Sequence, residues 1–214
     1  MSLVSLQIAD EPAIWSALGF TVTDGAVRIG GTDLELAGTS GLDPAWGAAS
    51  GTGITSWTLT GGVTDTIDGL PTRNADEGPP AVTRAASSHR NGVVAIDHVV
   101  VVTPDLDRTI DALAQNGFEL RRVRDAGGGR TQAFFWIGDV VLEVVGDPQR
   151  PSGPAQFMGL ALVSDDLEAT AAYIGPERCT TPKDAVQKGR RICGLTKAAA
   201  VSTPIAFMTA HVRA

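Results

Sequence analysis

The most constraining feature of this sequence is a run of apolar strand, polar helix cap and amphipathic helix that occurs more than once. Its clearest copy is IDHVVVVTPDLDRTIDALAQNGFEL, at residues 96–120. The same order of elements returns in GLALVSDDLEATAAYIG at 159–175 and, in shortened form, in SLQIADEPAIWSALGF at 5–20. Repetition of this kind predicts a fold built from similar supersecondary units, each burying its apolar face against a neighbour.

Composition places the chain among globular proteins and excludes several kinds of partner. Of its 214 residues, 43% are hydrophobic and 19% are charged, a balance typical of a chain with a packed core. The formal net charge of −7 argues against nucleic acid, because phosphate binding needs clustered Lys and Arg. Every apolar run is shorter than the ~20 residues of a membrane span, and Asp10 and Glu11 interrupt any N-terminal signal sequence. We therefore expect a cytoplasmic protein without a membrane partner, in which Cys179 and Cys193 are reduced thiols.

The middle copy predicts a complete βαβββ unit. Thr103-Pro104-Asp105 suits the start of a helix, with Thr103 as its cap, and Asn116-Gly117 suits its end. Three further strands are expected after this helix. They are separated by the glycine turn of AGGGR and by Gly138-Asp139, which are typical hairpin connections.

Less regular copies are expected on both sides of the middle one. Toward the C-terminus we expect the strand FMGLALV, a helix capped within SDD, and weaker strands in AVQKG, RRICGLT and TPIAFMTAHV. At the N-terminus, GAVRIGGTDLELAG (25–38) aligns without gaps to AFFWIGDVVLEVVG (133–146), and GTGITSWTLTG (51–61) resembles the first strand of a further copy. The expected division is degenerate N-terminal modules over 1–71, a polar connector over 72–92, and a domain over 93–214 made of modules 93–147 and 155–212.

These residues resemble the vicinal-oxygen-chelate superfamily, the group of glyoxalases, bleomycin-resistance proteins and ring-cleaving dioxygenases. The resemblance rests on IDHVVVVTPDL (96–106), NGF (116–118) and VVLEVVG (140–146). It extends well over residues 93–210 and more faintly over 3–61. It implies an α+β fold of repeated βαβββ modules, whose strongly curved mixed sheets form cups that enclose a ligand and often a divalent metal.

The resemblance also implies roles for two residues of the middle module. Metal-dependent members hold the ion with side chains of the first and last strands, and those positions are matched here by His98 and Glu143. Imidazole and carboxylate together suit Zn, Fe, Mn, Ni or Co. Glu143 would then be a ligand or a proton carrier, which makes it the candidate catalytic residue.

The C-terminal module lacks matching ligands. Gly159 takes its first-strand position, and Phe207 or Met208 takes its last-strand position. Glu35 and His211 are the candidates for a third ligand. If neither serves, the histidine and the carboxylate of the middle module would form a buried hydrogen bond instead of a metal site.

The hairpin after the helix predicts a ligand-binding face. If Gly138-Asp139 is a two-residue loop, Phe134 pairs with Glu143, and period-2 alternation fixes the rest of the face. That face is formed by Arg130, Gln132, Phe134, Trp136 and Glu143. A mixed aromatic and polar lining suits a pocket, although Phe134 and Trp136 would also suit an ordinary core.

Arginines are concentrated on the same predicted hairpin, in RRVRDAGGGR (121–130). Alternation with acidic neighbours makes a solvated rim one interpretation. The other is that Arg124 or Arg130 binds a carboxylate or phosphate at the mouth of the cup, where a guanidinium fork fits.

Three functions fit these features. The incomplete ligand set favours a small-molecule-binding protein, in which a cup without metal holds its ligand by stacking on Phe134 and Trp136. The alternative is a metal-dependent lyase, isomerase, epimerase or dioxygenase that acts on a small oxygenated substrate. The third is an interaction module whose degenerate copies only stabilise the fold. The sequence leaves open whether modules pair within one chain or across a homodimer.

Overall fold

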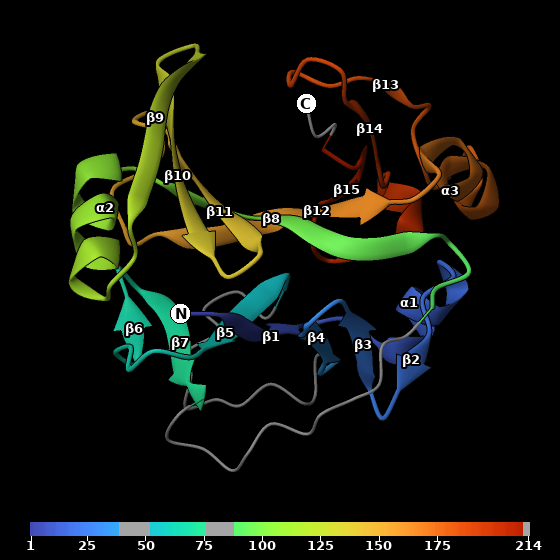
Figure 1. Cartoon of the computed structure of the whole chain (residues 1–214), viewed down its shortest axis with the longest axis horizontal. Helices are drawn as coiled ribbons and strands as arrows, with labels where there is room; N and C mark the ends of the chain where they lie inside the picture. Colours follow the sequence, from blue (N-terminus) through green and yellow to red (C-terminus); the bar gives the residue numbers. More distant parts are fainter. Residues whose placement is uncertain (39–51, 76–87, 212–214) are drawn as a thin grey trace.

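A computed structural model describes residues 1–38, 52–75 and 88–211, which form two mixed β-sheets flanked by short helices (Figure 1). One sheet has eight strands and curves into a cup, and the other has seven strands and lies beneath its base. The predicted α+β class with curved mixed sheets is confirmed. None of the described helices has both the length and the apolar character needed to cross a membrane.

The eight-stranded sheet consists of two βαβββ units of the same chain. Its strands and helices are β8 (Val93–Thr103), α2 (Leu106–Gln115), β9 (Leu120–Gly127), β10 (Arg130–Ile137), β11 (Val140–Gly146), β12 (Gln156–Ser164), α3 (Leu167–Ile174), β13 (Lys183–Asp184), β14 (Arg191–Gly194), the 3₁₀ helix η3 (Lys197–Ala199) and β15 (Ile205–Thr209). The strand order is β13-β14-β15-β12-β8-β11-β10-β9. In each unit the first strand runs parallel to the last, and the antiparallel pair β8–β12 joins the two units at the base of the cup.

The seven-stranded sheet repeats this arrangement in reduced form. Its elements are β1 (Leu3–Ile8), α1 (Pro12–Ala17), β2 (Val22–Thr23), β3 (Ala26–Ile29), β4 (Thr32–Leu36), β5 (Ile54–Leu59), β6 (Thr66–Ile67) and β7 (Leu70–Asn74). The order β2-β3-β4-β1-β5-β7-β6 places β5 antiparallel to β1, as β12 is to β8. In the second half of this sheet, the described residues 52–75 form three strands and no helix. This half therefore departs furthest from the βαβββ pattern.

Several local boundaries differ from the sequence prediction. Thr103 does not cap α2, because it stays in β8 and pairs with Gly146. Asp105 is the cap, and its side chain accepts a 3.0 Å hydrogen bond from the backbone N–H of Arg108. The strand predicted in AVQKG is instead a turn that follows β13, because Gly189 adopts a left-handed conformation there.

The predicted connector over 72–92 also begins differently. Its first residues belong to β7, which pairs in parallel with β5. Residues 76–87 of the connector, and residues 39–51 of the N-terminal segment, lie outside the described part of the chain.

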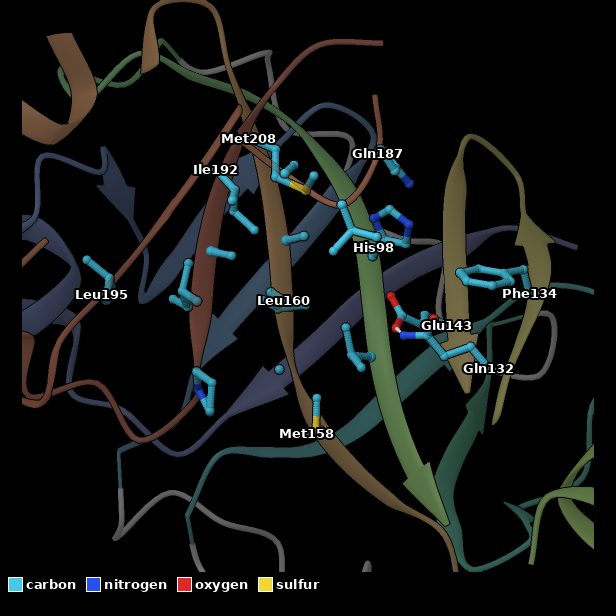
Figure 2. Close-up of a pocket in the computed structure, with 18 of the residues that line it drawn as sticks. His98, Gln132, Phe134, Glu143, Met158, Leu160, Gln187, Ile192, Leu195 and Met208 are labelled. Atoms are coloured by element: carbon cyan, nitrogen blue, oxygen red, sulfur yellow. Dashed lines mark hydrogen bonds between the residues drawn. The ribbon is translucent and has the colours of Figure 1, made fainter. Parts of the chain in front are cut away.

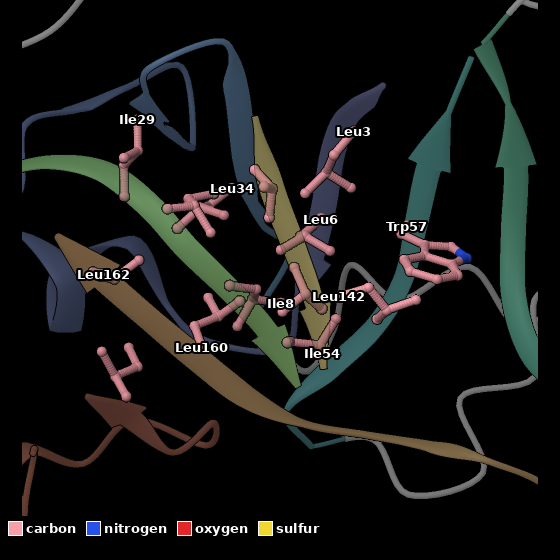
Figure 3. Packing of buried hydrophobic residues seen from close by; sticks show 14 of the residues in the cluster. Leu3, Leu6, Ile8, Ile29, Leu34, Ile54, Trp57, Leu142, Leu160 and Leu162 are labelled. Atoms are coloured by element: carbon pink, nitrogen blue, oxygen red, sulfur yellow. The ribbon is translucent and has the colours of Figure 1, made fainter. Parts of the chain in front are cut away.

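A shared hydrophobic core joins the two sheets. Figure 3 shows leucines of the cup, such as Leu142 and Leu160, among Leu6 and Trp57 of the seven-stranded sheet. The Trp57 ring stacks on Phe118 with 5.9 Å between ring centroids. Because the seven-stranded sheet covers the convex side of the cup, the concave side is the face left for a ligand.

Candidate functional site

The concave side of the eight-stranded sheet holds a cavity of about 390 Å³ (Figure 2). Both units of the sheet contribute to its wall, so the cup closes within one chain. The polar lining comes from His98, Arg124, Gln132, Glu143 and Gln187. The rest of the wall is apolar apart from backbone, with Met158, Leu160, Ile192 and Met208 among its side chains. A mostly apolar wall with a few grouped polar side chains is the usual lining of a small-molecule site.

The predicted register of the β10–β11 hairpin is confirmed, since Phe134 pairs with Glu143 across it. Gln132, Phe134 and Glu143 line the main cavity, as the alternation of the strands requires. Arg130 does not, because it lies at the end of the hairpin and its Nε donates to Asp147 over 3.1 Å. Trp136 is 50% exposed and lines a smaller, adjoining cavity of about 230 Å³.

A β-bulge in β8 places two consecutive polar residues away from the core. Pairing with β12 passes from His98 directly to Ile96, so Asp97 has no partner in the ladder. Neighbouring side chains in a regular strand point to opposite faces, but an extra residue changes that alternation. Ile96 and Val99 consequently both point into the core, while Asp97 and His98 lie together outside it.

Asp97 links His98 to a buried arginine. His98 Nδ1 contacts the Asp97 carboxylate, which also accepts hydrogen bonds of 3.0 and 2.9 Å from Nη1 and Nη2 of Arg190. Arg190 is 3% exposed, and its Nε donates to the Thr209 carbonyl over 2.8 Å. A carboxylate can only accept, so the Nδ1 of His98 carries the proton and a neutral ring keeps a free lone pair on Nε2. Burial alone would raise the pKa of Asp97, but hydrogen bonds from His98 and Arg190 outweigh burial and hold that pKa at about 2.

Glu143 is held by a second set of polar contacts. Gln132 donates its amide to the Glu143 carboxyl group, and Arg124 Nε donates to Gln132 Oε1 over 2.6 Å. The Arg124 guanidinium also lies over the Phe134 ring, 5.2 Å from its centroid. Burial raises the pKa of Glu143, although the charges of His98 and Arg124 and the bond from Gln132 oppose that change. The cavity therefore contains a carboxyl group that binds a proton more readily than an exposed glutamate.

These side chains do not complete a metal site. The second module offers Gly159 as the counterpart of His98. The strand register corrects the predicted counterpart of Glu143. In the first unit, Glu143 lies three residues before Gly146, which pairs with Thr103 at the end of β8. In the second unit, the residue three positions before Thr209, which pairs with Ser164 at the end of β12, is Ala206. The last-strand position is thus filled by an alanine, and not by Phe207 or Met208.

The predicted third ligands do not complete the set either, although His211 lines the smaller cavity together with His98. Glu35 lies on β4 of the seven-stranded sheet, where it pairs with Gln7, and His211 Nε2 lies 3.2 Å from Arg190. Across the described ranges, no three side chains of the His, Cys, Asp or Glu type are grouped closely enough to hold an ion. His98 and Glu143 alone do not fit a resident divalent metal. The direct hydrogen bond between them that the sequence suggested is also absent from the contacts of the described residues, where Asp97 and Gln132 are their partners.

Sequence reasoning missed Asp97 and Gln187, and it placed Arg190 only at the start of the predicted strand RRICGLT. The only local signal was an aspartate inside an otherwise apolar strand, next to a histidine. Such a residue is costly to bury without a partner, which predicts that a partner exists but does not identify it. Arg190 is 93 residues away in the sequence.

The Asp97→Asn variant should lose about 3–5 kcal/mol of unfolding free energy at neutral pH, because it leaves Arg190 buried without a counter-charge. The pKa of Asp97 is about 2 in the folded protein and ordinarily 3.8, so its contribution is present above about pH 4 and is lost as the pH falls toward 2. Urea unfolding measured from neutral to acid pH should show that the difference in unfolding free energy between the wild type and Asp97→Asn decreases by about 2 kcal/mol. If the unfolding free energies of the two proteins change with pH in parallel, the Asp97–Arg190 ion pair does not account for the stability. The matched control is Asp107→Asn, at the exposed start of α2.

The Glu143→Gln variant should be more stable than the wild type above neutral pH, by roughly 1 kcal/mol. Because the pKa of Glu143 is raised in the folded protein, the protonated carboxyl group that stabilises the fold is lost as the pH rises through that pKa. The amide of the glutamine variant has no proton to lose in this range, so it avoids this cost. The advantage should disappear near pH 4. Thermal unfolding across this range measures it, with Glu119→Gln on the exposed surface as control. A Glu143→Gln variant that is less stable at high pH would show that the carboxylate is stabilised by its neighbours.

Several solved structures are similar to part of this chain. Among solved structures, a methylmalonyl-CoA epimerase from Mycobacterium tuberculosis is 18% identical, with a TM-score of 0.48 over 61% of this chain and 95% of that chain. A Streptomyces coelicolor methylmalonyl-CoA epimerase variant in complex with 2-nitronate-propionyl-CoA is 22% identical, with a TM-score of 0.46 over 57% and 99%. A hypothetical protein from Bacillus halodurans is 15% identical, with a TM-score of 0.46 over 56% and 96%. At TM-scores below 0.5, neither activity nor ligand carries over to this chain.

No curated protein matches the sequence. Residues 95–183, which run from β8 to β13, match the family model described as Glyoxalase/Bleomycin resistance protein/Dioxygenase superfamily. This match identifies residues 95–183, the first βαβββ unit and the start of the second, as a glyoxalase-like domain of that superfamily.

Proposed function

We propose that the protein binds a small, largely apolar molecule in the cup of its eight-stranded sheet, and that it does so without a resident metal. The observation that supports this proposal is the cavity of about 390 Å³, which falls within the range of roughly 300–1,000 Å³ typical of small-molecule sites. Removal of apolar ligand surface from water would supply most of the affinity. The polar side chains would orient the ligand, because those labelled in Figure 2 lie on one side of the cavity.

The proposal assigns different roles to the two aromatic residues of β10. Phe134 lines both cavities and would stack on the ligand, whereas Trp136 lines only the smaller one. The proposed binding domain comprises the modules predicted over 93–147 and 155–212. In the segment 1–71, the described residues 1–38 and 52–71 support its convex side. Because both modules contribute to one cavity, the proposed site does not require a second copy of the chain.

Binding of N-phenyl-1-naphthylamine, a neutral dye that fluoresces in apolar sites, tests the proposal. The wild type should show one saturable site. The Ala206→Phe variant should bind at least about tenfold more weakly, because its ring fills the cavity. The matched control is Ala114→Phe on the exposed side of α2, which should bind as the wild type does. Equal binding by Ala206→Phe, with an unchanged circular dichroism spectrum, would place the dye outside the cup.

Acid–base chemistry of the lyase or isomerase type is a second candidate function. The buried chain of Arg190, Asp97 and His98 favours it, because a carboxylate on Nδ1 fixes the orientation of the ring and leaves Nε2 to accept a proton. Glu143, whose pKa is raised by burial and which lies on the same side of the cavity as His98, would return a proton to the bound substrate. Metal-dependent forms of such chemistry, ring-cleaving dioxygenation included, would need a ligand set that the described residues do not complete.

Deuterium uptake from heavy water tests this candidate on a panel of small 2-oxo and 2-hydroxy acids followed by NMR. The wild type should exchange one carbon-bound proton of its substrate without added metal, since His98 would act as the base. The His98→Gln variant should lower the exchange rate by about 10²-fold or more while still binding N-phenyl-1-naphthylamine. Exchange that appears only after Zn²⁺, Mn²⁺, Ni²⁺, Co²⁺ or Fe²⁺ is added would contradict the metal-free scheme.

A further inference from the structure

The smaller cavity of about 230 Å³ adjoins the main one, and four of its lining residues line both. The shared residues are His98, Arg124, Phe134 and Gln187. The smaller cavity adds Arg121, Arg122, Trp136 and His211 to them. A ligand in the cup would therefore reach, at its outer end, a region with a different chemistry from that of the apolar wall.

Two arginines of β9 have donors available there. Arg122 pairs with Phe134 and Arg124 with Gln132, so both side chains share the face of β10 that lines the cup. In the described part of the chain, Arg122 has no ion-pair or hydrogen-bond partner, and Arg124 uses only its Nε. Arg121 contributes less, because Glu119 offsets its charge over 2.7 Å.

Further donors come from the opposite unit of the cup. Arg190 Nη1 donates to Gln187 Oε1 over 2.7 Å and lies 3.2 Å from His211 Nε2. Because an arginine can only donate, Gln187 keeps its amide NH₂, and a His211 that accepts at Nε2 keeps the proton on Nδ1. Figure 2 shows the amide nitrogen of Gln187 on the side of the cavity that faces Phe134.

Acidic side chains are absent from the described lining of this smaller cavity. The nearby carboxyl of Glu143 belongs to the main cavity and is hydrogen-bonded by Gln132. Asp97, the other acid of the region, is already paired with Arg190. The chain as a whole carries a net charge of −7, so this donor-rich region contrasts with the rest of the molecule.

We propose that the smaller cavity is an anion subsite, and that the ligand of the cup is an amphipathic organic acid. This inference rests on the proposed binding function and deepens it. The apolar body of the ligand occupies the main cavity beside Phe134, and its oxyanion, a carboxylate or a phosphate, meets Arg122 and Arg124. Each guanidinium can present two parallel N–H groups to such an oxyanion, which fixes the orientation as well as the charge of the ligand.

Binding of two dyes with the same aromatic body tests the anion subsite separately from the apolar main cavity. 1-Anilinonaphthalene-8-sulfonate carries a sulfonate, and N-phenyl-1-naphthylamine is its uncharged counterpart. The wild type should bind the sulfonate at least about tenfold more tightly, because charge-assisted hydrogen bonds add to apolar burial. Added salt should weaken the sulfonate more than the neutral dye.

The Arg122→Ala variant should lose most of the preference for the sulfonate and bind the neutral dye within about twofold of the wild type, because Arg122 lines only the smaller cavity. Arg90→Ala removes the same kind of charge from an exposed position outside both cavities and should retain the preference. If the wild type binds both dyes equally, or if Arg122→Ala keeps the full preference, the subsite is overturned and the proposed function stands. If neither dye binds, both fall.

Competition identifies the anion that the subsite prefers. Phenylacetate and phenyl phosphate should displace the bound sulfonate dye, and the more effective of the two shows whether a carboxylate or a phosphate is the better fit. The uncharged 2-phenylethanol should displace it far more weakly. Equal displacement by all three would overturn the subsite, since it would show that only the aromatic body is recognised.

Discussion

The buried ion pair between Asp97 and Arg190 is the contact through which the two modules of the cup share a site. It joins β8 of the first unit to the segment before β14 of the second, and Arg190 also holds the Thr209 carbonyl at the end of β15. Taking two charges out of water is expensive, and well-packed apolar residues are often at least as stable. The pair is therefore better explained by what it positions, which is His98 on one side and Gln187 on the other.

Glu143 is a second buried group of the cup whose charge costs stability. A carboxyl group whose pKa is raised by burial costs stability when it ionises, and Gln132 and Arg124 only partly offset that cost. An amide at the same position would keep the shape without the charge. Buried groups with shifted pKa values are often found where a protein binds a ligand or transfers a proton, so the shifts of Glu143 and Asp97 agree with the proposal that this cavity is the functional one.

Local sequence patterns predicted those features that depend on neighbouring residues. The two-residue loop at Gly138-Asp139 fixed the pairing of Phe134 with Glu143, because hairpin register follows from loop length. The same alternation assigned Trp136 to the face of Phe134, yet the curvature of the sheet carries it beyond the main cavity. Alternation gives the face of a strand, but it does not give the depth of a side chain along the cup.

Features that depend on distant pairing could not be predicted in this way. The bulge at Asp97 shifts the alternation of β8 by one residue, and only the partner strand β12 reveals it. The assignment of Phe207 or Met208 opposite Glu143 failed for a related reason. The register of β12 with β15 places Ala206 there, and a comparison of sequences without that register is wrong by one or two residues.

The two units of the cup contribute different side chains to its lining, and this difference suits the proposed ligand with two chemically different ends. The first unit supplies His98, Glu143 and the arginines of β9. The second supplies an apolar wall around Met158, Ile192 and Met208, together with Gln187 and His211. In a symmetric cup the positions of Gly159 and Ala206 would also carry polar ligands, and a central ion would join the halves. Their small side chains leave room for the body of a ligand instead. The small side chains of the second unit would therefore face the apolar body of the proposed ligand, and the arginines of the first unit would face its charged end.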